Sequence, residues 1–126
     1  MAFVIAYTKQ GDSYFNCVNE SMHLALSENG REYELLRNNT GVLFPLASFT
    51  EGKIEGTTKT LRYPWIFSKK DGSYGVCCVR RNQDGKDPLS EGSVMLFSSE
   101  NLIRYQETGF LKVADTEIRD PRCCFD

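Results

Sequence analysis

Two short segments of the chain place an arginine and a proline around one variable residue. They are Arg62-Tyr63-Pro64 and Arg119-Asp120-Pro121. An ionised aspartate can accept a proton near neutral pH, whereas a phenol with its ordinary pKa of about 10 cannot. An arginine offers a planar fork of donors to hydroxyl or carboxylate oxygens. These segments are therefore the first candidates for acid-base or binding chemistry.

Each candidate also has a purely structural interpretation. Asp120 precedes a proline, which favours extended backbone in the residue before it, so its carboxylate can simply cap a turn. Arg62 and Arg119 can equally tie strands together through ion pairs. The sequence leaves both interpretations open.

An aromatic stripe follows the first of these arginines. Tyr63, Trp65 and Phe67 occupy alternate positions, so the pattern predicts one strand face that carries three rings. Such a face can stack against the apolar side of a sugar, but it more often forms core between neighbouring sheets.

The cysteines and the single histidine give no metal site. The cysteines are Cys17, Cys77, Cys78, Cys123 and Cys124. They contain no C-x-x-C spacing, and adjacent residues of a strand point to opposite faces, so they are expected to be small hydrophobic residues in reducing surroundings. His23 has no obvious catalytic neighbours in sequence, which favours a structural or surface role. We expect neither a metal nor another cofactor.

Composition bounds the function classes. The chain has 126 residues, of which 40% are hydrophobic and 25% charged, and these proportions predict one globular β domain over residues 1–126. Fifteen basic and seventeen acidic residues, with no basic run longer than two, argue against a nucleic-acid partner. No stretch approaches the roughly 18 apolar residues of a membrane span. A cytoplasmic location is the default expectation, and secretion stays open if a signal peptide has been removed.

Strand patterns run along most of the chain. Alternation or β-branched and aromatic runs predict strands at 3–8, 22–27, 63–67, 74–79 and 93–98. Turn residues stand between them at Gly11-Asp12, Glu28-Asn29-Gly30, Asp71-Gly72 and Asp84-Gly85. Residues 98–105 could form a single helical turn. The fold class is all-β, and the long loops at 37–60 and 81–92 are where binding groups tend to collect.

The chain also contains an internal repeat. "SENGREYE" at 27–34 matches "SENLIRYQ" at 99–106 with an offset of 72 residues, and "LRYPWI" at 61–66 matches "IRDPRC" at 118–123 with an offset of 57. Each unit consists of a strand, a Ser-Glu-Asn turn, an aromatic strand, a loop, an Arg-x-Pro strand, a glycine-containing turn and a strand. Four short strands per repeat are typical of propeller blades.

The order of these motifs resembles the opening blades of the five-bladed propeller glycosidases of glycoside hydrolase family 43, in particular its arabinofuranosidase and xylosidase members. The resemblance covers about residues 3–126. It implies about two blades of an incomplete ring, with blade one at 3–80 and blade two at 93–126. It also implies a carbohydrate partner that contains arabinose or xylose, bound by Arg62, Trp65 and Arg119.

The resemblance implies a catalytic site built from an aspartate base, a second aspartate that tunes it and a glutamate acid. The base of the related enzymes stands between the arginine and the proline, which is Tyr63 in this chain. Three interpretations follow. Tyr63 fills space in a catalytically silent relative, another carboxylate such as Asp120 serves as the base, or the match is misplaced.

Two blades do not close a ring, and the general acid is expected beyond Asp126. The sequence therefore predicts a glycosidase-like portion of a longer chain that is inactive alone. The alternative is a non-catalytic module that binds carbohydrate or associates with itself through open blade edges.

Overall fold

The computed structural model describes residues 2–9, 20–44, 49–50, 53–54, 59–82 and 92–124. Most elements in these ranges are β-strands, and the helical content is one short 3₁₀ segment, η1 (Leu36–Asn39). The all-β prediction is confirmed. The turns expected at Gly11-Asp12 and Asp84-Gly85, Cys17 and most of the two long loops lie outside the described residues.

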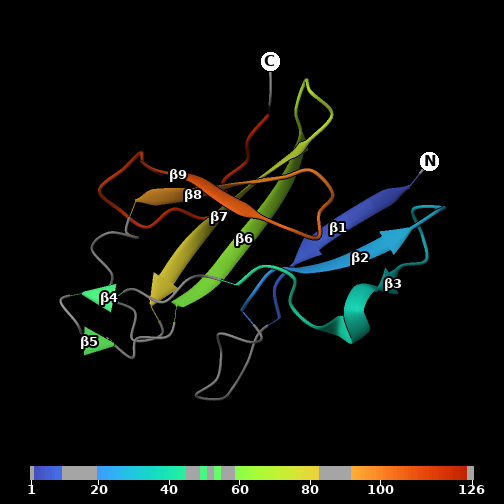
Figure 1. The fold of residues 1–126 in the computed structure, drawn as a ribbon, viewed down its shortest axis with the longest axis horizontal. Helices are drawn as coiled ribbons and strands as arrows, with labels where there is room; N and C mark the ends of the chain where they lie inside the picture. Colours follow the sequence, from blue (N-terminus) through green and yellow to red (C-terminus); the bar gives the residue numbers. More distant parts are fainter. Residues whose placement is uncertain are drawn as a thin grey trace.

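The first sheet contains three antiparallel strands in the order β1 (Phe3–Tyr7), β2 (His23–Ser27) and β3 (Glu34–Leu35). Its long strands coincide with the predicted alternating segments at 3–8 and 22–27. Figure 1 shows this sheet at the right of the molecule, with η1 following β3.

The second sheet is a four-stranded antiparallel meander in the order β6 (Lys59–Ser68), β7 (Tyr74–Asn82), β8 (Ser93–Ser99) and β9 (Gln106–Lys112). The predicted turn at Asp71-Gly72 joins β6 to β7, and Gly72 has a φ of 84°, which glycine adopts readily. A separate pair, β4 (Phe49–Thr50) and β5 (Lys53–Ile54), lies in the predicted loop.

The sheets divide the chain differently from the expected blades. β7 pairs with β8, so residues assigned to blade one at 3–80 and to blade two at 93–126 share one sheet. The physical reason is the antiparallel pairing of β7 with β8, which runs from Tyr74↔Ser99 to Cys78↔Met95 and joins the two strands in one sheet. The unit of structure therefore begins at the Arg-x-Pro strand β6 and ends at β9.

One apolar core joins the two sheets. Its buried members come from the first sheet and the adjoining chain (Met22, Leu24 and Leu43) and from the second sheet (Leu61, Val76, Cys78, Met95 and Phe97). The first sheet thus packs one of its faces against one face of the second, and the hydrophobic effect stabilises their contact.

The internal repeat is present in the backbone pairing. Ala25↔Leu35 and Leu26↔Glu34 in the first sheet become Phe97↔Glu107 and Ser98↔Gln106 in the second, which is the same register moved by 72 residues. Likewise, Phe3 pairs with Ser27 as Tyr74 pairs with Ser99. Strands β1, β2 and β3 are therefore equivalent to β7, β8 and β9.

The two Ser-Glu-Asn turns are alike in atomic detail. The Asn29 side chain accepts hydrogen bonds from the backbone N–H groups of Arg31 and Glu32 at 2.9 and 3.0 Å. The Asn101 side chain accepts the equivalent bonds from Ile103 and Arg104 at 2.9 and 3.0 Å. Asparagine in these turns replaces a backbone acceptor, and residues 98–105 form this turn rather than a helical one.

The serine of each turn has a matching role. Ser27 Oγ accepts from Gly30 N–H at 2.9 Å, and Ser99 Oγ accepts from Leu102 N–H at 2.8 Å. Gly30 and Leu102 both have positive φ, at 73° and 59°. The second turn therefore holds a leucine in a conformation that glycine adopts at lower cost.

Within the described part of the chain, no helix has the length and apolar character needed to cross a membrane.

Candidate functional site

The first Arg-x-Pro segment forms a bulge in β6. Arg62 pairs with Val79 and Trp65 pairs with Cys77, so Tyr63 and Pro64 together face one residue of β7. Tyr63 has a φ of 54°. This left-handed conformation is the one that a glycine usually adopts in a G1-type β-bulge. The expected alternation of three rings is therefore interrupted at Tyr63, while Trp65 and Phe67 remain in the ladder opposite Cys77 and Gly75.

The second Arg-x-Pro segment repeats the left-handed backbone conformation of the middle residue. Asp120 has a φ of 50° and, like Tyr63, stands between arginine and proline. The equivalence expected from the sequence is thus visible in the backbone. Asp120 is exposed, and its carboxylate lies 3.4 Å from the guanidinium of Arg122.

The two segments lie beside one another. Trp65 Nε1 donates to the carbonyl of Cys123 at 2.9 Å, and Cys77 Sγ donates to the carbonyl of Pro121 at 3.5 Å. The Arg122 guanidinium lies 4.9 Å from the centre of the Trp65 ring, within range of a cation–π interaction. Residues 121–123 are therefore held against the Trp65 and Cys77 pair of the second sheet.

Arg62 has a carboxylate partner. Its guanidinium donates two hydrogen bonds to Glu20, from Nη2 to Oε1 at 2.9 Å and from Nε to Oε2 at 3.3 Å. Glu20 is buried, and its carbonyl accepts from Leu61 N–H at 2.6 Å. Of the two roles predicted for Arg62, this geometry supports the ion pair that ties segments together.

Arg119 is the most open of the predicted binding residues. Its side chain is 75% exposed, and its Nε lies 3.7 Å from Glu117. Trp65 is 38% exposed. The predicted residues Trp65 and Asp120 are thus brought together through Arg122, which contacts both, whereas Arg119 contacts Glu117.

Sequence reasoning missed Arg122 and Glu20. Aligning the two Arg-x-Pro segments at their 57-residue offset matches Trp65 with Arg122. Because these residues are unlike, the alignment did not indicate that they contact each other. Glu20 stood in a polar stretch, and its pairing with Arg62 over 42 residues depends on the tertiary fold.

The cysteines divide by exposure. Cys77 and Cys78 are buried, Cys123 is half-buried and Cys124 is exposed. Burial, together with the nearby Cys123 thiol, raises the pKa of Cys77 to about 12. Burial also raises the pKa of Cys78 strongly. These two thiols are protonated at neutral pH and behave as the expected small hydrophobic residues.

His23 is buried rather than on the surface. Its Nδ1 donates to the Ser21 carbonyl at 2.9 Å, and its ring stacks on Tyr7 with centroids 5.4 Å apart. Burial, with a smaller contribution from the positive charge of Lys9, lowers its pKa below the usual 6.5. The neutral ring packed in this way has the structural role that the sequence favoured.

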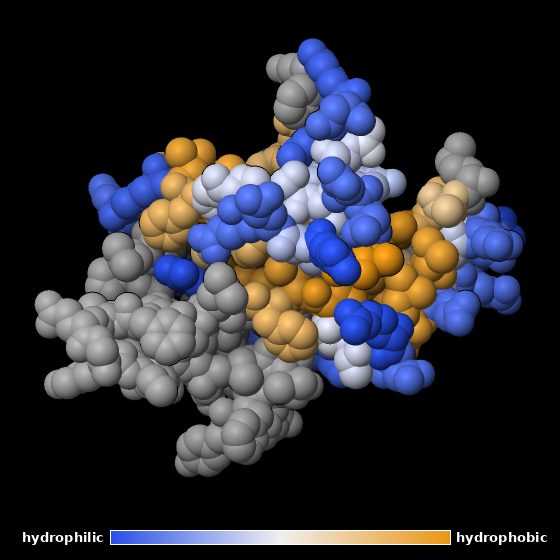
Figure 2. Space-filling model, in the orientation of Figure 1, coloured by the Kyte–Doolittle hydropathy of each residue, from blue (hydrophilic) through white to orange (hydrophobic). Residues whose placement is uncertain are grey.

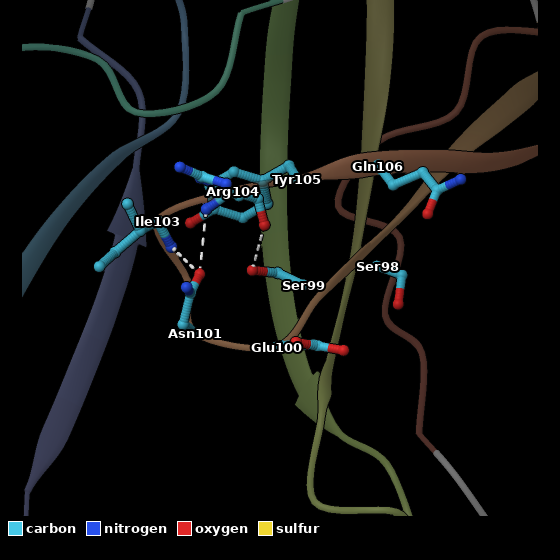
Figure 3. Close-up of a pocket in the computed structure, with 8 residues that line it drawn as sticks. All are labelled: Ser98, Ser99, Glu100, Asn101, Ile103, Arg104, Tyr105 and Gln106. Atoms are coloured by element: carbon cyan, nitrogen blue, oxygen red, sulfur yellow. Dashed lines mark hydrogen bonds between the residues drawn. The ribbon is translucent and has the colours of Figure 1, made fainter.

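A hollow of about 610 Å³ opens beside the second Ser-Glu-Asn turn. Figure 3 shows that Ser99 and Asn101 use their side-chain oxygens in hydrogen bonds within the turn. Ser98 Oγ accepts from Lys69 Nζ at 2.7 Å. The hollow is therefore lined largely by groups that stabilise the turn, and it contains none of the predicted site residues.

Within the described ranges, no group of three or more His, Cys, Asp or Glu side chains could hold a metal ion.

Comparisons with protein-family models, with curated proteins and with solved structures find no match to this chain. The glycoside hydrolase resemblance thus remains a prediction that rests on the sequence motifs.

Proposed function

We propose that this chain is a portion of a propeller-type β protein and that, by itself, it binds pentose-containing carbohydrate without cleaving it. The observation that carries the proposal is the exposed Trp65 ring, which is flanked by Arg122 and lies next to the second Arg-x-Pro segment. Apolar sugar faces lie well on indole rings, and guanidinium groups bind hydroxyls in a defined orientation.

Repetition supports the propeller part of the proposal. The two sheets share a strand register, a turn type and a 72-residue period, and they pack face against face. Stacked units of this kind are the building principle of propellers.

We expect no cleavage because of the side chains at the middle of the two Arg-x-Pro segments, Tyr63 and Asp120, which we call the first and second corners. Glycoside hydrolysis needs two carboxyl groups on opposite sides of the scissile bond. Tyr63 supplies a phenol at the first corner. At the second corner the Asp120 carboxylate lies 3.4 Å from the Arg122 guanidinium, a contact that suits the pair to orient a ligand.

The intrinsic fluorescence of Trp65 provides the test, because it is the one tryptophan in the chain. We expect arabino- or xylo-oligosaccharides to change its emission in a saturable way. Arg122→Ala should weaken this binding, whereas Arg31→Ala, at an exposed arginine of the first Ser-Glu-Asn turn, should leave it unchanged. An emission spectrum that does not respond to either class of sugar contradicts the proposal.

A second candidate function is glycoside cleavage with Asp120 as the general base. It is favoured by the exposed carboxylate of Asp120, which stands between arginine and proline as Tyr63 does at the base position of the resemblance. Incubation with aryl arabinofuranosides and xylosides tests it. Release of the aryl group that Asp120→Asn abolishes supports this candidate, and no release, in either the native chain or Tyr63→Asp, removes it.

A further inference from the structure

The equivalence of the two sheets identifies a face of the first sheet that is more exposed than the equivalent face of the second sheet. In the second sheet, Val76 and Phe97 lie on the face that packs against the first sheet, and both are buried. Their equivalents in the first sheet are Ile5 and Ala25. Ile5 is 42% exposed where Val76 is 0% exposed.

Ile5 belongs to an apolar patch, the uncovered face of the first sheet, which consists of Phe3, Ile5 and Leu35; Ala25, on the same face, is buried at 4% exposure. The three large side chains of this face are exposed, with Leu35 at 49%. Figure 2 shows apolar surface over β1 and β2 at the right of the view. Exposed apolar patches of this kind usually mark interaction sites.

The covered interface shows which surface fits this face. Met22 and Leu24 of the first sheet cover the second sheet. The 72-residue offset makes Val94 and Leu96 their equivalents, and these lie on the opposite face of the second sheet together with Leu111, which pairs with Val94. This set, Val94, Leu96 and Leu111, is the far face of the second sheet, in which Leu111 is 55% exposed, Leu96 is half-buried and Val94 is buried within the chain. Because two of its residues are equivalent to Met22 and Leu24, we expect the far face to cover the uncovered face of a first sheet.

Among the described residues, the first sheet also has no equivalent of strand β6. In the second sheet, the Arg-x-Pro strand β6 pairs with β7, whereas the equivalent edge of β1 pairs with no strand among the described residues. The segment 118–124 has the Arg-x-Pro sequence and the left-handed central residue of β6, and it belongs to neither sheet. Its contacts with Trp65 and Cys77 place it beside the second sheet, where a further sheet would stack.

We propose that two copies of this chain associate head to tail. The uncovered face of the first sheet of one copy packs on the far face of the second sheet of the other, and residues 118–124 of the latter add to the free edge of β1. Each chain carries both halves of the contact, so the interface is heterologous. Strand addition satisfies the open edge of β1 in the way that edge strands commonly pair with a partner chain.

The β6 and β7 register predicts the new pairing. β1 and β7 are offset by 71 residues, since Phe3 corresponds to Tyr74, and the Arg-x-Pro segments are offset by 57. With these two offsets, Trp65↔Cys77 and Phe67↔Gly75 become Arg122↔Ala6 and Cys124↔Val4. Directly opposed residues of an antiparallel pair have separations that a disulfide can span. Position 4 of one copy should therefore reach Cys124 of the other.

The first experiment measures mass in solution by sedimentation over a range of concentrations. We expect species of at least twice the 14.3 kDa monomer. Ile5→Lys should raise the dissociation constant by about 100-fold or more, because a lysine would enter an apolar contact. Ile103→Lys is the matched control, since Ile103 is 67% exposed on a turn outside the proposed contact. A monomer at all concentrations, or equal effects of the two variants, overturns the proposal.

Mixing distinguishes a head-to-tail contact from two first sheets meeting face to face. Ile5→Lys and Leu111→Lys should each be impaired alone, and an equimolar mixture should recover a two-chain species, because one intact contact remains between the two variants. An impaired Ile5→Lys beside an unimpaired Leu111→Lys overturns the head-to-tail arrangement. Thermal unfolding of each variant verifies that the chains are folded.

The second experiment links the copies covalently. Val4→Cys is treated with oxidised glutathione, which takes the two protons and two electrons of two thiols and leaves as two glutathione thiols. We expect a disulfide between position 4 of one chain and Cys124 of another, identified by mass spectrometry in the dimer band. Phe3→Cys, whose side chain points to the other face, should not form it. A missing link at position 4, or equal linking from position 3, overturns the proposed register.

Discussion

Tyr63 and Asp120 occupy the same backbone position in two different parts of the chain. Each stands between arginine and proline, with φ at 54° and 50°. The left-handed conformation costs about 1–2 kcal/mol for an ordinary side chain and less for aspartate or asparagine. What repeats between the two segments is therefore the corner in the backbone, and the side chain at its apex differs.

The corner makes Tyr63 sensitive to the type of its replacement. We expect Tyr63→Val to be less stable than Tyr63→Asp by about 1 kcal/mol, since a β-branched residue tolerates the left-handed conformation poorly. Both replacements remove the tyrosine ring. The loss of its packing therefore largely cancels when the free energies of unfolding of the two variants are compared. Urea unfolding of the two variants measures it. Equal stabilities would mean that the backbone at position 63 leaves the left-handed conformation in the variants, so that the fold does not require it.

Arg62 should matter for stability more than the exposed Arg119. Arg62→Met leaves the buried Glu20 carboxylate without its two charged donors, and we expect a loss of about 1–2 kcal/mol, reduced by the partial exposure of Arg62. Arg119→Met removes an exposed pair and should change stability by less than about 0.5 kcal/mol. Denaturant unfolding compares them.

A second replacement tests the cause of that loss. Glu20→Gln in the Arg62→Met background removes the unpaired charge and should recover part of the stability. If the double variant is no more stable than Arg62→Met, then the arginine acts through packing rather than through the carboxylate.

The sequence predicted the strands better than it predicted the side chains around Trp65. Alternation in β1 and β2 is a local property, and the Ser-Glu-Asn turns are fixed by hydrogen bonds within six residues, so both could be read from the chain. The bulge at Tyr63 could not, because a tyrosine gives no sign that it takes a position usual for glycine. The partners of Arg62 and Trp65 come from segments 42 and 58 residues away, and only the tertiary fold brings them close.

The asparagines of the two turns should contribute equally. Asn29→Ala and Asn101→Ala each remove an acceptor of two backbone N–H groups, and we expect each to cost about 1–2 kcal/mol. The neighbouring exposed Glu28→Ala and Glu100→Ala are the controls, with changes below about 0.5 kcal/mol. Costs that differ strongly between the two asparagines would contradict the equivalence of the turns.

The thiols should react in the order of their exposure. Cys124 is exposed, whereas burial holds the pKa of Cys77 at about 12. Because the thiolate is the nucleophile, iodoacetamide at mildly alkaline pH should label Cys124 well before Cys77 in the native protein. Peptide mass spectrometry over time gives both rates, and denaturant should abolish the difference. Equal native rates would show that the 121–123 segment does not cover Cys77.

His23 should make the stability of the fold depend on pH. Its folded pKa lies below the value of about 6.5 expected in the unfolded chain, so the unfolded state binds more protons as the pH falls. The stability is therefore complete above pH 6.5 and declines as the pH drops toward the folded pKa, by at most about 1.4 kcal/mol per pH unit. Urea unfolding at pH 7.5, 6.5 and 5.5, values spaced about one unit around this pKa, measures the slope.

His23→Met is the matched control for this slope. Methionine already occupies the equivalent position in the second sheet, as Met95, so the replacement suits the strand. Because His23 is the one histidine of the chain, the variant has no side chain with an ordinary pKa in this range, and its stability should stay nearly constant between pH 7.5 and 5.5. A variant that declines as steeply as the native chain would assign the pH dependence to carboxylates instead of the buried imidazole.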